Sequence, residues 1–199
     1  MPTETLIALF ALAATAAWTP GPNNLMLAAS GANFGLRRTV PHALGVAIGC
    51  FAMMFAVASG LGAIIAASPV AKEAMRWLGA GLLLWFAWRF ANAGRASADA
   101  RSRPLSFLEA AGFQWVNPKA WAMMLAMSAQ FVSGENIWLE SAICGFAFAA
   151  TGIFSSFVWA SFGVGIAQFL QSDRRLRVFN IVMALTLVAF VVLLVRGDI

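Results

Sequence analysis

Two short motifs rich in proline, glycine and asparagine interrupt long apolar stretches of this 199-residue sequence. The first motif reads Trp18-Thr19-Pro20-Gly21-Pro22-Asn23-Asn24. Its prolines lack a backbone donor and clash with the preceding turn, and Gly21 lets the chain bend, so a continuous helix is not expected. The carbonyl groups just before it lose their helical partners and need protein, water or a bound solute instead. The motif therefore predicts a broken helix that faces a cavity.

The residues after this first break suit a carboxylate. Pro22 fits the first turn of a helix, where no backbone donor is needed, and the positive end of that half-helix would point at the break. Free backbone amides at a helix N-terminus bind anions. Asn23 and Asn24 add side-chain amides that can donate or accept hydrogen bonds.

The second motif reads Gln114-Trp115-Val116-Asn117-Pro118-Lys119. Pro118 predicts another break, and Asn117 could cap the half-helix that follows. Lys119 is the most conspicuous charge within any apolar run and the strongest single functional candidate. An ammonium at the bilayer centre costs at least ~2.5–3.5 kcal/mol, so Lys119 is expected to face a wet cavity or a partner. The alternative is a shallower helix whose lysine snorkels to the headgroups.

Each break could also be a structural kink that only packs helices, since a lone proline kink is usually just that. The two breaks, however, occupy matching positions. A shift of 97 residues places Trp18 on Trp115, the first proline motif on the second, and Met26 on Met123. Paired breaks in two halves of a membrane protein are the best sequence pointer to a transport site.

Two further titratable residues are candidates for proton coupling. Glu109 precedes Lys119 by ten residues, about 15 Å along a helix, so the two cannot pair directly. An interfacial position is favoured for Glu109, with an entrance or coupling role as the alternative. His42 could relay protons, but beside Pro41 and the basic Arg37-Arg38 pair an interfacial position is favoured again.

No metal site and no cofactor are expected. Cys50 and Cys144 sit inside apolar segments without ligand-like neighbours, so they are predicted to pack as small apolar side chains.

The composition places the chain in a lipid bilayer. Hydrophobic residues make up 61%, charged residues 11%, and the mean hydropathy is +0.81, which leaves too little polar surface for a soluble domain. The predicted fold is an all-α integral membrane protein, one domain over 1–199. Six apolar runs are each long enough to span the membrane: 5–28, 41–67, 70–93, 106–131, 137–169 and 178–196.

The predicted spans divide into two repeats of three helices, about 1–93 and 105–199, joined by a basic linker at about 94–104. An odd number of spans per repeat inverts the second repeat relative to the first, as in many transporters. The spacing Gly45-x-x-x-Gly49 indicates close helix packing and would permit a homo-oligomer.

The net charge of +5 comes from short clusters of Lys and Arg between apolar runs, so membrane topology explains it better than nucleic-acid binding. Cytoplasmic loops carry the excess of Lys and Arg. Clusters follow the first, third and fifth predicted spans, which places both termini in the periplasm. The basic residues of these clusters are Arg37, Arg38, Arg89, Arg95, Arg101, Arg103, Arg174, Arg175 and Arg177.

Together, the Pro-Gly-Pro-Asn motif, the spaced glycines and Asn-Pro-Lys some hundred residues later resemble the LysE/RhtB family of amino-acid exporters. The resemblance covers essentially the whole chain. It implies export of amino acids or their derivatives across a bacterial inner membrane, with energy expected from the proton gradient. The family's motif residues fall on Pro20, Gly21, Pro22, Asn23, Asn117, Pro118 and Lys119.

The expected mechanism is alternating access by a secondary transporter. A zwitterionic solute would bind between the two broken helices, its carboxylate held by half-helix amides or Lys119, with further hydrogen bonds from Asn23, Asn24, Asn117 and Gln114. The alternatives are a passive channel or a structural membrane subunit. An enzyme is not expected, because the sequence offers neither a His-rich metal cluster nor a nucleophile with a base.

Overall fold

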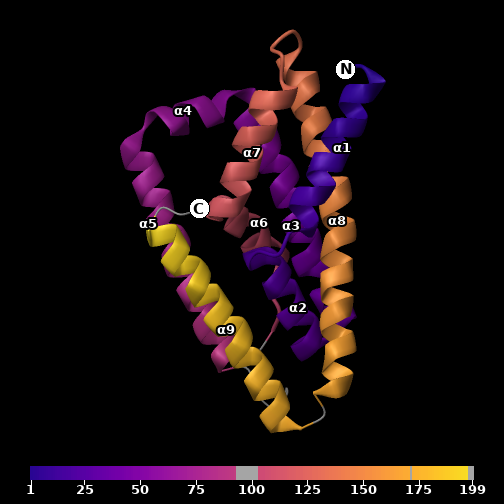
Figure 1. Cartoon of the computed structure of the whole chain (residues 1–199), viewed down its shortest axis with the longest axis vertical. Coiled ribbons are helices and arrows are strands. Elements are labelled where there is room, and N and C mark those ends of the chain that lie inside the picture. The colour runs from indigo at the N-terminus through magenta and orange to yellow at the C-terminus, as the bar shows by residue number, and fades with distance from the viewer. Residues whose placement is uncertain (93–102, 171, 197–199) are drawn as a thin grey trace.

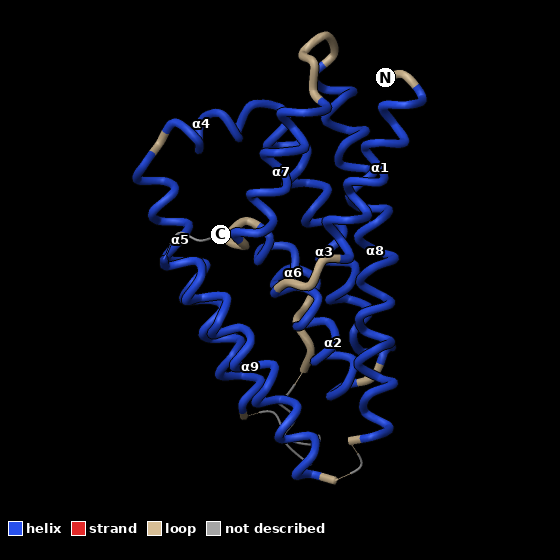
Figure 2. Tube along the Cα trace, viewed as in Figure 1, coloured by secondary structure: helices blue, strands red, loops and turns tan. Residues whose placement is uncertain are grey.

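The computed structural model describes residues 1–92, 103–170 and 172–196, and this part of the chain is almost entirely helical, without strands (Figures 1 and 2). The all-α prediction is therefore confirmed. Most of the predicted linker 94–104, with Arg95 and Arg101, lies outside the described residues. The helices are α1 (Thr3–Trp18), α2 (Pro22–Phe34), α3 (Leu36–Ala56), a π-helical segment (Val57–Leu61), α4 (Gly62–Ala67), α5 (Pro69–Ala91), α6 (Phe107–Gln114), α7 (Pro118–Phe131), α8 (Ile137–Phe169) and α9 (Asp173–Arg196).

Both predicted breaks are confirmed. Helix α1 ends at Trp18 and α2 begins at Pro22, with a bend of 57° between them. Helix α6 ends at Gln114 and α7 begins at Pro118. In each pair a proline occupies the first turn of the second helix, where its missing N–H costs nothing.

The helices are those of a multi-pass membrane protein. Within the described residues, three helical stretches are long and apolar enough to cross a membrane, and four if the bent α1–α2 pair counts as one span. The first of the three, Leu36–Ala67, includes the π-helical segment, where Gly60 has a φ of 122°. That backbone conformation is strained for any residue with a side chain, so Gly60 allows the turn from α3 into α4.

Helices α2 and α8 pack with their backbones in contact. A Cβ atom added at Gly31 would lie 2.0 Å from the carbonyl oxygen of Ala160, and one at Gly163 would lie 1.9 Å from that of Ala28. Close approach of this kind needs glycine on both helices. The two helices therefore pack tightly where these glycines lie.

The Gly45-x-x-x-Gly49 spacing serves packing, as predicted. A Cβ at Gly45 would lie 2.3 Å from the carbonyl oxygen of Phe107, and one at Gly49 would lie 2.6 Å from the Cα of Ala111. Both glycines thus face α6 of the same chain. This motif therefore gives no support to the predicted homo-oligomer, which stays a prediction.

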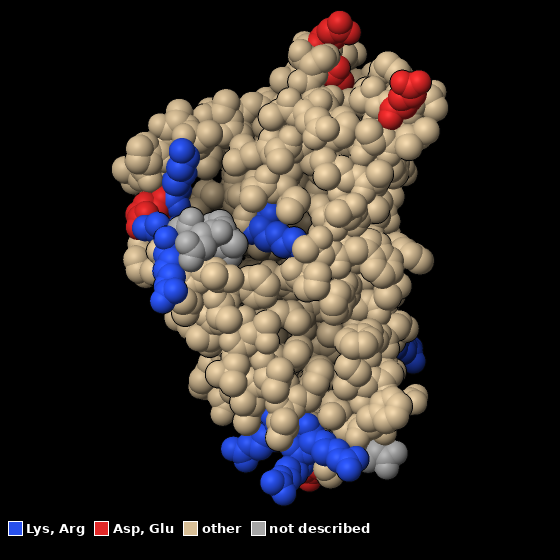
Figure 3. All heavy atoms as spheres, in the orientation of Figure 1, with Lys and Arg blue, Asp and Glu red and all other residues tan. Residues whose placement is uncertain are grey.

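Basic residues dominate one end of the molecule on the face shown in Figure 3, acidic residues lie at the other end, and both kinds lie together at the side near the start of α5. Lys and Arg gather on this face at the end where α8 turns into α9, whereas the acidic residues at the opposite end lie near the N-terminus and the α7–α8 connection. The connection between α7 and α8 includes Glu135, and the first turn of α8 carries Glu140. The predicted orientation rests on the excess of Lys and Arg at one end and stays a prediction.

Candidate functional site

The fold brings the two breaks together, although they lie a hundred residues apart. The Nζ of Lys119 donates a hydrogen bond to the carbonyl oxygen of Thr19. Asn23 and Gln114 form a reciprocal amide pair, with Nδ2 of Asn23 2.7 Å from Oε1 of Gln114 and Nε2 of Gln114 3.2 Å from Oδ1 of Asn23. The side chain of Lys119 therefore turns toward the first break.

The carbonyl groups released at the first break are satisfied by protein, one of the outcomes predicted. The Nδ2 of Asn24 lies 3.0 Å from the carbonyl oxygens of both Ala17 and Thr19. Ser155 on α8 donates to the Ala17 carbonyl from 2.8 Å. The carbonyl groups at the break are therefore bonded by Asn24 from α2 and by Ser155 from α8.

The second break is held by its own side chains. Oδ1 of Asn117 accepts a hydrogen bond from the backbone N–H of Lys119 at 3.2 Å, which confirms the predicted cap of α7. The indole Nε1 of Trp121 donates to the carbonyl oxygen of Trp115 at 2.8 Å. Asn117, like Asn23 and Gln114, is therefore engaged in holding the breaks.

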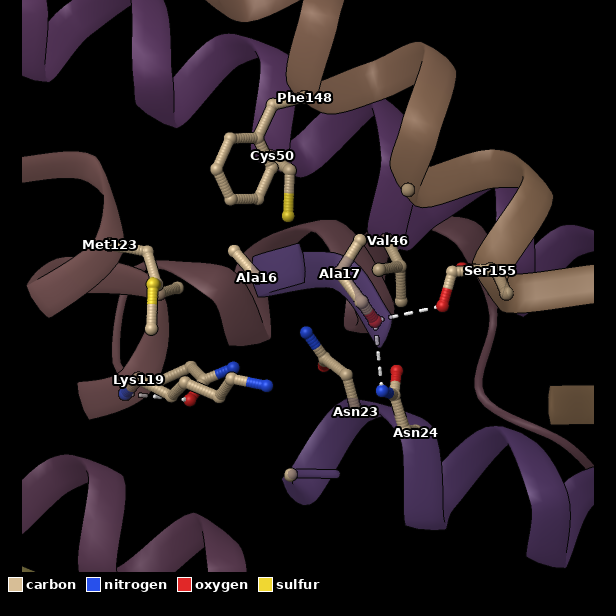
Figure 4. A pocket seen from close by; sticks show the side chains of 15 residues that line it. Ala16, Ala17, Asn23, Asn24, Val46, Cys50, Lys119, Met123, Phe148 and Ser155 are labelled. Carbon is tan, nitrogen blue, oxygen red and sulfur yellow. Dashed lines mark hydrogen bonds between the residues drawn. The ribbon is translucent and has the colours of Figure 1, made fainter. Parts of the chain in front are cut away.

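A cavity of about 50 Å³ lies between the breaks (Figure 4). A single water needs roughly 10–15 Å³ of such space, so the cavity has room for a handful of waters or for a small solute. Of the predicted site residues, the lining includes five, whereas Pro20, Pro22, Gln114 and Pro118 shape the breaks without facing the cavity. The lining residues are Ala16, Ala17, Gly21, Asn23, Asn24, Val46, Cys50, Asn117, Lys119, Ala120, Met123, Phe148, Gly152, Ser155 and Ser156.

Lys119 is the one charged residue in this lining, which contains no Asp or Glu among the residues that the structure describes. Gly21 makes room for it, because a Cβ there would lie 2.8 Å from the lysine Cδ. A cationic group that faces a cavity without a carboxylate beside it is an anion site. The arrangement suits a ligand that brings its own negative charge.

Sequence reasoning missed the contribution of α8, namely Phe148, Gly152, Ser155 and Ser156. The adjacent serines inside the apolar run 137–169 were the available indication. Cys50 is free and buried, as predicted for both cysteines, but it also lines the cavity, with Sγ 3.5 Å from Oε1 of Gln114.

The two proton-coupling candidates lie outside the cavity lining. His42 is fully buried, because α3 packs it toward α2, where its Nδ1 lies 3.1 Å from Oγ of Ser30. Its predicted depth at the membrane interface stays a prediction. Glu109 is partly exposed and forms a capping box with Ser106 at the start of α6. It also accepts hydrogen bonds from Arg103 at 2.6 and 2.8 Å, which raise the pKa of that guanidinium.

The Asn24→Ala substitution should destabilise the first break. It removes both hydrogen bonds from Nδ2 to the Ala17 and Thr19 carbonyls, and a net loss of about 1–3 kcal/mol in the free energy of unfolding is expected. Thermal unfolding in detergent, followed by tryptophan fluorescence, measures the effect. Asn92→Ala is the matched control, because within the described residues that exposed side-chain amide bonds the Trp88 carbonyl at the end of α5 and no group at either break. Equal midpoints for the two variants would contradict the assignment.

Comparison with known proteins adds the family. A family model described as LysE type translocator matches residues 14–198. The cysteine/O-acetylserine efflux proteins of Salmonella typhimurium and Escherichia coli K12 are each 29% identical to this chain over 174 residues, which cover 86% of this chain and 88% of theirs. No solved structure matches. The chain therefore belongs to the LysE type translocator family.

Proposed function

We propose that this protein is a secondary transporter that exports a small amino acid or amino-acid derivative across the bacterial inner membrane. The observation that carries the proposal is the inward-facing ammonium of Lys119 in a cavity between two broken helices, with no carboxylate in the described lining. The names of the related cysteine/O-acetylserine efflux proteins support the substrate class.

Lys119 is assigned the carboxylate of the substrate. In the structure it bonds a neutral carbonyl oxygen, that of Thr19. A substrate carboxylate offers a stronger, charge-assisted bond, and the N-terminus of α2 next to it adds partial positive charge. On binding, Lys119 would thus exchange its bond to the Thr19 carbonyl for one to the substrate carboxylate.

The substrate ammonium is assigned to neutral oxygens on the far side of the cavity. Asn24 uses its Nδ2 to close the break, which leaves Oδ1 as an acceptor. Ser156 lines the cavity and makes no side-chain hydrogen bond within the described part of the chain. These two groups complement an ammonium without needing a buried acid.

Transport by alternating access is part of the proposal, with six spans arranged as two inverted repeats. In this arrangement α1 and α2 correspond to α6 and α7. The matching breaks support the correspondence, and the separation of charge between the two ends supports an orientation with both termini in the periplasm. The halves would rock about the cavity.

Coupling to protons is the remaining part of the proposal. Of the two candidates, Glu109 is held in an ion pair with Arg103, which makes it a poor carrier. His42 is the better one, because it is buried between α2 and α3 and its Nε2 has no hydrogen-bond partner among the described residues.

The test is export of a panel of labelled amino acids, including cysteine and O-acetylserine, from cells that overexpress the protein. We expect extrusion of small neutral members and its loss when a protonophore collapses the proton gradient. Extrusion that persists with the protonophore and only follows the concentration gradient would favour a passive channel. No extrusion of any member by a well-expressed protein would overturn the proposal and favour a structural subunit.

A further inference from the structure

Helix α8 forms the side of the cavity that the predicted motifs do not touch. Figure 4 shows the ring of Phe148 beside Cys50, on the side of the cavity away from Lys119 and Asn23. Gly152 lines the same cavity one helical turn after Phe148. Residues four apart share a helix face, so Phe148 and Gly152 present one continuous surface to a bound solute.

Gly152 differs from the packing glycines of this protein. A Cβ at Gly163 would strike the backbone of α2, whereas a Cβ at Gly152 would meet nothing within 4 Å. Glycine inside a helix is less stable than alanine, and no neighbour requires it at this position. What Gly152 provides is open space inside the cavity.

On the Phe148 side of Gly152 the wall of this space is apolar and uncharged, whereas Ser156 lines the cavity on the other side of Gly152. Phe148 is 6% exposed, and Val46 and Cys50 are equally buried beside it. A substrate whose carboxylate lies at Lys119 would direct its side chain toward this wall. A charged side chain would lose its hydration there without gaining a partner, and a large one would collide with the phenyl ring.

We propose that Gly152 and Phe148 set the size limit for the substrate side chain, so that the transporter selects small, uncharged amino acids. Phe148 forms the end of the space and Gly152 its open side. This assignment rests on the proposed function and adds to it the residues that choose among amino acids.

The experiment compares transport of alanine, cysteine, methionine and leucine in proteoliposomes that contain the wild type or a variant. Gly152→Leu fills the space and should lower transport of cysteine relative to alanine roughly tenfold or more, the scale on which apolar pockets discriminate small differences in size. Phe148→Ala should change the selectivity in the opposite direction, with methionine and leucine gaining on alanine by a similar factor.

Gly165→Leu is the matched control. It lies on the same helix, a Cβ there also meets nothing within 4 Å, and it does not line the cavity. It should leave all ratios unchanged. If Phe148→Ala fails to fold, the Gly152→Leu variant still tests the proposed size limit, because it only adds a side chain to open space.

The two proposals fail in different ways. Wild-type transport of small amino acids with unchanged ratios in Gly152→Leu would overturn the size limit and leave the transport function intact. Absence of transport of every amino acid by the folded wild type would overturn the transport function itself.

Discussion

Replacing Lys119 with alanine should lower amino-acid export by roughly 10- to 150-fold. The substitution removes the one charged group of the cavity lining and with it the charge-assisted hydrogen bond assigned to the substrate carboxylate. Bonds of this kind contribute about 1.5–3 kcal/mol, which corresponds to a factor of that size. Initial export rates, normalised to the amount of protein in the membrane, measure the effect.

The fold should survive this substitution. The Thr19 carbonyl keeps its bond from Asn24, and the Asn23–Gln114 pair still ties the two breaks together. Lys72→Ala is the matched control, because that lysine lies on α5 outside the cavity between the breaks. Export at the wild-type rate by a stably expressed Lys119→Ala protein would remove Lys119 from the site and, with it, the observation on which the proposed function depends.

Local chain chemistry accounts for what could be predicted. Both breaks follow from the residues themselves, because Pro20 and Pro22 flank a flexible glycine and Pro118 follows a capping asparagine. Proline alone does not decide this, since Pro41 lies inside α3. The cost of an ammonium in lipid likewise singles out Lys119 in any fold that puts its helix in the membrane. The apolar run 137–169 coincides with α8 because nothing within it interrupts a helix.

Contacts between distant segments account for what could not be predicted. The bond from Lys119 to Thr19 and the support of the first break by Ser155 depend on how α1, α7 and α8 meet in space. The burial of His42 depends on α2 packing over α3. Neighbouring residues in the sequence do not show which distant segments pack together, so the sequence gives no sign that another helix covers His42.

The packing of the two halves is unequal, which bears on transport. Helix α2 packs closely along α8, whereas α7, which the proposed repeat arrangement makes the counterpart of α2, packs only loosely against α3. Two inverted repeats in one conformation of an alternating-access transporter should differ in this way, with one side sealed and the other parted. On this interpretation the glycine contacts between α2 and α8 are the sealed side, at the end where basic residues gather.

The Gly163→Ala substitution tests this interpretation and should have a large effect for a single methyl group. The new Cβ would lie 1.9 Å from the carbonyl oxygen of Ala28, a distance that backbone atoms can relieve only by moving the helices apart. Overpacking costs about 1–3 kcal/mol, so the sealed conformation should lose population by roughly 5- to 150-fold. Export should fall accordingly, and a cysteine placed on α2 should become more reactive toward a water-soluble thiol reagent.

Gly165→Ala, two residues further along α8, is the control, because its Cβ meets nothing within 4 Å. It should leave both export and thiol reactivity unchanged. Equal export by the two variants would mean that the α2–α8 contact does not separate or tighten during transport, since a contact that must re-form in each cycle cannot absorb a methyl group at this distance without slowing. Reduced export without increased reactivity would place the damage in folding and not in the seal. The pair of measurements therefore separates a moving interface from a static one.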